Sequence, residues 1–136
     1  MTLPVTALTA AICALLMLFL IFKVVGQRLR TETGFGAGND PKLDMVRGCH
    51  SNLIENAPIA ILLLALLEMT NAHHWGLTGL AGLFLISRVI HIYGMHQHFA
   101  DKTIRLRQLG VVGSALSILA LALWVLYLFI TVNLVN

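Results

Sequence analysis

Polar side chains recur at helical spacing inside two otherwise apolar stretches of the chain. Gly48, Asn52 and Glu55 follow i, i+4, i+7 spacing and would share one helix face. Arg88 and His91 lie three residues apart in a later apolar stretch and would share a face in the same way. An ionisable group in hydrocarbon costs several kcal/mol unless it is paired or hydrated, so these residues indicate a functional site within a membrane.

The elements that must position these side chains are membrane helices. The chain has 136 residues, of which 58% are hydrophobic and 11% charged, with a mean hydropathy of +0.86. Soluble domains carry about 25% charged residues, and a membrane-spanning helix needs about 20 apolar residues. We therefore predict an all-α integral membrane fold, a single domain over 1–136. Its four transmembrane helices are expected at about 3–27, 42–70, 75–97 and 103–134.

The basic residues predict how this bundle is oriented. Lys and Arg gather in the first connection, 23–47, and around the third, 94–107, whereas the second connection, 68–74, has none. By the positive-inside rule, the first and third loops are cytoplasmic and both termini lie outside. The sequence pI near 9.2 reflects this asymmetry and gives no indication of nucleic-acid binding.

Glu55 and Arg88 are expected at similar depth in the bilayer. At 1.5 Å per residue, Glu55 lies roughly 16 Å beyond Asp44, and Arg88 roughly 15 Å before His98. The two opposite charges could pair within one chain or between subunits, and the pair could be structural or part of a site.

A net cationic cluster is expected in the cytoplasmic half of the bundle. Such a cluster suits an anionic, polar ligand held by guanidinium groups, although single basic residues also extend to lipid headgroups without further function. The spacing of His91, His96 and His98 does not predict a metal site, because His91 and His98 lie two turns apart. The predicted cluster comprises Arg28, Arg30, Asn52, Glu55, Arg88, His91, Tyr93, Arg105 and Arg107.

The order of these motifs resembles one family across nearly the whole chain. "RLR" follows the first helix, "HSNLIENAP" opens the second, "SRVIHIYG" closes the third and "RLRQLG" opens the fourth. This arrangement is similar to small bacterial members of the membrane-associated proteins in eicosanoid and glutathione metabolism (MAPEG). The resemblance implies a homotrimeric four-helix bundle in the bacterial inner membrane, with glutathione bound between subunits in the cytoplasmic half.

The same resemblance implies roles for individual residues. Arg28, Arg30, Asn52, Glu55, Arg88, His91 and Tyr93 would bind glutathione. Arg107, or alternatively Arg105, would stabilise the thiolate as the catalytic residue. Two positions depart from the family pattern. Gly48 stands where many members have Arg, with Arg47 one place earlier, and Met95 stands where several have Tyr.

The expected function is a glutathione-dependent transferase or peroxidase in the membrane. Glutathione would be the co-substrate, with no metal, and a lipophilic electrophile or hydroperoxide would enter from the lipid. The alternative is a non-catalytic trimer that binds glutathione or a lipophilic ligand. A proton-coupled exporter ranks last, because the first apolar stretch, Leu3–Phe22, contains no acidic residue.

Overall fold

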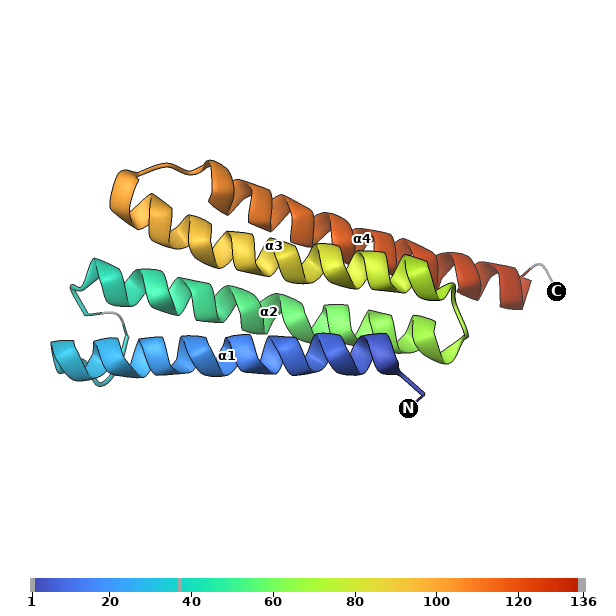
Figure 1. The fold of residues 1–136 in the computed structure, drawn as a ribbon, viewed down its shortest axis with the longest axis horizontal. Coiled ribbons are helices and arrows are strands. Elements are labelled where there is room, and N and C mark those ends of the chain that lie inside the picture. The colour runs from blue at the N-terminus through green and yellow to red at the C-terminus, as the bar shows by residue number, and fades with distance from the viewer. Residues whose placement is uncertain (1, 37, 135–136) are drawn as a thin grey trace.

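The computed structural model describes residues 2–36 and 38–134 and contains four long helices (Figure 1). Each is long and apolar enough to cross a membrane. The predicted all-α, four-helix membrane fold is confirmed, although the first and third helices run further than expected, to Thr31 and Asp101. The helices are α1 (Pro4–Thr31), α2 (Pro41–Met69), α3 (His74–Asp101) and α4 (Arg105–Leu134).

Local sequence signals set several helix ends. Pro41 opens α2, and the side chain of Asp40 caps this helix by accepting a hydrogen bond of 3.0 Å from the Lys42 amide. The helices α1 and α3 end where Glu32 and Lys102 adopt left-handed φ angles of 51° and 57°. These ends bring the first and third loops to the same end of the bundle (Figure 1).

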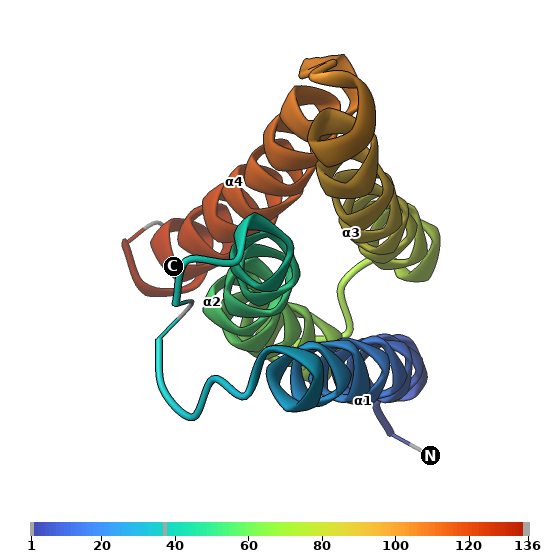
Figure 2. The ribbon, with the colours of Figure 1, turned by 90° about the vertical axis from the view of Figure 1, so that its left-hand side faces the viewer.

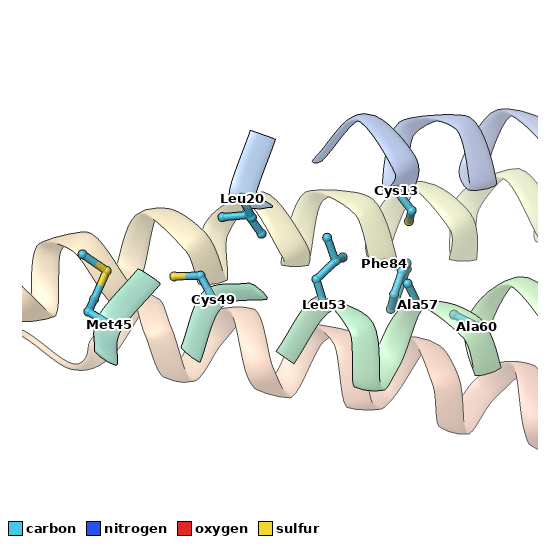
Figure 3. Packing of buried hydrophobic residues seen from close by; sticks show 8 residues of the cluster. All are labelled: Cys13, Leu20, Met45, Cys49, Leu53, Ala57, Ala60 and Phe84. Carbon is cyan, nitrogen blue, oxygen red and sulfur yellow. The ribbon is translucent and has the colours of Figure 1, made fainter. Parts of the chain in front are cut away.

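The helices pack as two antiparallel pairs, α1 with α2 and α3 with α4 (Figure 2). Helices α2 and α3 join the pairs, because each of them contacts all three other helices, whereas α1 and α4 make no contact within the described residues. A buried cluster fills the space between α1, α2 and α3 and includes Leu20, Cys49, Leu53 and Phe84 (Figure 3).

The outer surface of the bundle is strongly apolar. Large side chains such as Leu15, Phe22 and Leu29 have 67%, 71% and 76% of their surface exposed in the single chain. Contiguous exposed apolar surface of this extent requires lipid or other subunits to cover it. Helix α4 is the least buried of the four, so it offers the widest surface to such neighbours.

At the opposite end of the bundle, Glu68 near the end of α2 caps the start of α1. Leu3, at the N-cap of α1, provides no side-chain hydrogen bond. The Glu68 carboxylate instead accepts hydrogen bonds of 2.9 Å from the backbone N–H groups of Val5 and Thr6. These are donors that a helix cannot satisfy within itself, so Glu68 ties α1 to α2.

Candidate functional site

Arg88 lies in a buried hydrogen-bond network that joins α2, α3 and α4. Its side chain is only 2% exposed. The guanidinium donates to the Asn52 side-chain oxygen on α2, to the Ser114 hydroxyl on α4 (Nε to Oγ, 2.8 Å) and to the Gly110 carbonyl (3.2 Å). Ser114 Oγ also donates to the Gly110 carbonyl at 2.8 Å. Every acceptor of Arg88 is uncharged, so the cation is satisfied by oriented dipoles.

Close backbone approach between α3 and α4 makes this network possible. A Cβ atom added at Gly110 would lie 2.6 Å from the His91 Cα, and one added at Gly94 would lie 2.8 Å from the Arg107 Cα. Only glycine permits such contacts. The glycines therefore bring the backbone at Ser114 within reach of Arg88 and place the start of α4, with Arg107, against α3.

Glu55 does not join the Arg88 network. Its side chain is exposed and accepts a hydrogen bond of 2.7 Å from the Ser51 hydroxyl. Of the two arrangements left open by the sequence, pairing of Glu55 with Arg88 within one chain is not the one that the structure shows. The reason is helical phase, because Glu55 follows the buried Leu53 by two residues and lies about 200° around the helix from it. A pairing between subunits stays a prediction.

Glu55 instead lines a groove between α1 and α2, at the end that carries the first and third loops. The groove has a volume of about 630 Å³. We call it the Glu55 groove, and its lining residues are Val24, Arg28, Asp44, Arg47, Gly48, His50, Ser51, Ile54 and Glu55. Arg28 is held in place by hydrogen bonds from Nη1 to the carbonyl oxygens of Thr33 (3.1 Å) and Gly34 (2.8 Å). His50 Nε2 is buried and has no partner among the described residues.

Arg47 is a groove residue that was absent from the predicted site. The sequence signal was present, because Arg47 immediately precedes Gly48, where the family pattern places an arginine. Position 48 lies close to α3 in the structure. A Cβ there would lie 3.1 Å from Met95 Cε, so this position faces α3 at close range. Ser114 was also missed, although a hydroxyl one turn after Gly110 in an apolar helix is an indication of buried hydrogen bonding.

The predicted basic pair after the first helix is divided between two grooves. Arg28 lines the Glu55 groove, whereas Arg30 lines another groove together with Lys23 and Lys42. The two arginines are two residues apart, which corresponds to a rotation of about 200° around the helix. They cannot act as one cluster within a single chain.

The remaining predicted residues lie on α3 and α4. His91 is buried against α4, whereas Tyr93 is 63% exposed on the outer face of α3. Arg107 is half-buried and Arg105 is exposed at the start of α4. The Glu55 groove is lined by α1 and α2 alone. Within residues 2–36 and 38–134, no three His, Cys, Asp or Glu side chains gather closely enough to hold a metal ion.

Comparison with known proteins gives the family. The model of the MAPEG family matches residues 6–127, almost the whole chain. The chain belongs to the MAPEG family. Its relatives include the inner membrane protein YecN of Escherichia coli (strain K12), which is 36% identical over 93 residues, covering 68% of this chain and 70% of YecN. YecN of Escherichia coli O6:H1 (strain CFT073) shows the same identity and coverage. No solved structure matches the chain significantly.

Membership of the MAPEG family confirms the resemblance inferred from the motifs. The four-helix membrane bundle is the architecture of this family, and the relative YecN is described as an inner membrane protein. The motifs that carried the resemblance, "HSNLIENAP" and "SRVIHIYG", contain Asn52 and Arg88, which the structure joins by a hydrogen bond. In this MAPEG chain the two motifs therefore meet in space.

Proposed function

We propose that this MAPEG protein is a glutathione-dependent transferase or peroxidase that acts on lipophilic electrophiles or hydroperoxides at the cytoplasmic side of the inner membrane. The observation that carries the proposal is the mixed charge of the Glu55 groove. Arg28 and Arg47 in its lining are cationic, and Glu55 is anionic. Glutathione carries two carboxylates and one ammonium group, so it needs cationic and anionic partners in one groove.

The spacing of charges along α2 fits a tripeptide. Arg47 and Glu55 are eight residues apart, which corresponds to about 12 Å along the helix axis. A tripeptide spans about 10 Å when extended. Guanidinium groups of Arg28 and Arg47 would bind carboxylates in bidentate fashion, and Glu55 would accept a hydrogen bond from the ammonium group.

Asn52 and Arg88 would have different roles in this site. Asn52 lies one residue after Ser51 of the groove, and Arg88 holds its side-chain oxygen in place. Because all the donors of Arg88 face protein acceptors, we assign Arg88 as a positioning residue rather than a direct ligand.

The thiolate would be stabilised from a second chain. Arg107 lies on α4, outside the α1–α2 groove, so an Arg107 that reaches the glutathione sulfur in this groove would come from a neighbouring subunit. The proposal therefore includes an oligomer, which we take to be the homotrimer, with Arg30, His91 and Tyr93 available on other faces of each chain. A thiol has an ordinary pKa of about 8.5, and a nearby cation lowers it.

The chemistry follows from the thiolate. With an aryl halide, the sulfur forms a bond to carbon and the halide leaves with its bonding electrons. With a lipid hydroperoxide, the sulfur attacks the terminal oxygen, the O–O bond breaks, and the lipid leaves as an alcohol after protonation. The resulting sulfenic acid reacts with a second glutathione to give the disulfide and water.

Glutathione titration of the purified full-length protein in detergent tests this proposal. We expect saturable binding and a thiolate absorbance signal, both lost in Arg47→Gln and Glu55→Gln, but kept in Lys102→Gln, a matched change at an exposed loop cation. Stabilisation by glutathione without any conjugation or peroxide reduction would instead support the non-catalytic trimer. Equal binding by Arg47→Gln, Glu55→Gln and the native protein would overturn the assignment of the groove.

A further inference from the structure

The second groove at the loop end of the bundle has a composition unlike that of the Glu55 groove. Its volume is about 390 Å³, and it lies between α1, α2 and α3. We call it the Lys23 groove, and its lining residues are Phe22, Lys23, Gly26, Gln27, Arg30, Lys42, Met45, Val46 and His96. Three of these carry a full positive charge and none is acidic, so the groove is cationic without an internal counter-charge.

The acidic residue Asp40 adjoins the groove and is hydrogen-bonded to two of its lining residues. Asp40 Oδ2 accepts a hydrogen bond of 2.7 Å from Gln27 Nε2, and Oδ1 accepts one from the Lys42 amide. Gln27 is thereby held at the edge of the groove, and the Asp40 carboxylate caps α2. Asp40 keeps its negative charge in these contacts and acts on Lys42, so it offsets part of the positive charge, while Lys23 and Arg30 remain available to an anion from outside the chain.

The groove also has apolar lining, of which Phe22 is exposed toward the lipid and Met45 and Val46 are buried. Phe22 is 71% exposed beside it, and Met45 and Val46 form the opposite side. The Lys23 ammonium lies 5.3 Å from the centre of the Phe19 ring, at the boundary between apolar and charged surface. Lys23 and Arg30 are about 10 Å apart along the helix axis, enough to extend across a headgroup layer of about 5–8 Å.

We propose that the Lys23 groove binds the phosphate of an anionic glycerophospholipid, with an acyl chain against Phe22. A free phosphate would satisfy the charges but not the apolar wall, and a zwitterionic lipid would bring its own cation to a site that already holds three. The Glu55 groove differs in this respect, because it contains Glu55 and Asp44. Within one chain, the lipid site lies in a different groove from the proposed glutathione site.

Native mass spectrometry of the full-length protein in detergent, with added phosphatidylglycerol, tests the proposal. We expect a bound phosphatidylglycerol that survives activation, with a dissociation constant on the order of 100-fold higher in the triple variant Lys23→Gln, Arg30→Gln, Lys42→Gln. Arg28→Gln is the control, because Arg28 is a cation of the same helix that lines the Glu55 groove instead. Its lipid retention should equal that of the native protein.

A steric variant keeps the proposal testable if the triple variant does not fold. A Cβ at Gly26 would have no heavy atom within 4 Å, so a side chain can start into the groove from this position, and Gly26→Leu leaves every charge in place. We expect Gly26→Leu to lose the bound phosphatidylglycerol. Retention of the lipid by Gly26→Leu, equal retention of phosphatidylcholine, or equal stabilisation by inorganic phosphate would each overturn the proposal.

Discussion

The guanidinium of Arg88 on α3 donates a hydrogen bond to the side-chain oxygen of Asn52 on α2. The same guanidinium reaches Ser114 and Gly110 on α4, so one buried side chain joins three helices. An arginine in this position does not present a free donor to a ligand. It fixes where Asn52 points, beside the groove that contains Glu55.

Replacing Arg88 with Leu should destabilise the protein strongly. The change leaves Asn52 and Ser114 without their buried partner, and each lost charge-assisted hydrogen bond contributes about 1.5–3 kcal/mol. We expect the free energy of unfolding, measured by denaturant titration in micelles, to fall by about 3 kcal/mol. Arg105→Leu is the control, because this exposed side chain should change stability by less than about 0.5 kcal/mol. Weakened glutathione binding with unchanged stability would show that Arg88 contacts the ligand directly.

Gly110→Ala should separate α3 from α4. The new Cβ would meet the His91 backbone at 2.5 to 2.6 Å, and backbone atoms cannot rotate away as a side chain can. We expect a loss of about 1–3 kcal/mol in the free energy of unfolding. Gly79→Ala is the matched control, since its Cβ would meet no heavy atom within 4 Å and should stabilise the helix slightly. Equal stability of the two alanine variants would contradict the close contact.

Glu68→Ala should loosen the start of α1. The substitution removes the acceptor of the Val5 and Thr6 amides, and loss of a helix cap costs about 1 kcal/mol. We expect faster hydrogen exchange at both amides and a matching fall in stability. A second change, Leu3→Ser, would supply a cap within α1 itself and should restore part of the protection. No change in exchange at Val5 and Thr6 would rule out capping by Glu68.

The carboxyl group of Asp40 should titrate below its ordinary range. The hydrogen bond from Gln27 lowers the pKa of Asp40, and backbone hydrogen bonds at the start of α2 act in the same direction. Because the folded-state pKa is depressed, this stabilisation is present above the unfolded-state pKa of about 3.9 and is lost as pH falls through the folded value. Carbon NMR should show the Asp40 pKa rising in Gln27→Leu. An unchanged value would exclude the Gln27 contact in solution.

Arg107→Ala should slow conjugation more than it weakens glutathione binding. If Arg107 stabilises the thiolate, its loss removes one donor to the developing charge and should lower kcat on the order of 100-fold. Steady-state rates with an aryl halide, together with the thiolate absorbance, measure this effect. Lys102→Gln serves as the control. A loss of the thiolate signal in Arg105→Ala, with Arg107→Ala fully active, would transfer the role to Arg105.

Much of the architecture could be predicted from local patterns. Hydropathy predicted four membrane helices, and the Pro41 and Gly/Asn/Asp region correctly indicated the break before α2. The motifs around Asn52 and Arg88 predicted MAPEG membership, which the family match confirms. The predicted bounds were short for α1 and α3, because left-handed residues at Glu32 and Lys102 end these helices later than their hydropathy suggests.

The grouping of the site residues required the tertiary structure. Sequence spacing gives the position of a residue along a helix and around its axis, so Glu55 and Arg88 could be placed at similar depth from the sequence. The direction in which each face points depends on which neighbours the helix packs against. Packing of Leu53 and Ala57 into the core turns Glu55 outward. The glycine contacts bring α4 close to α3, and Arg88 donates hydrogen bonds to Ser114 on α4 and Asn52 on α2.

The amino-acid sequence by itself therefore determined the membrane-spanning helices, the basic end of the bundle and the family, because these depend on composition and order along the chain. Only the tertiary structure decided that Arg28 and Arg30 belong to different grooves, that Arg47 joins Glu55, and that Arg88 is satisfied within the protein. These outcomes depend on rotation about each helix axis, and that rotation is set by side-chain packing between helices rather than by any one helix alone.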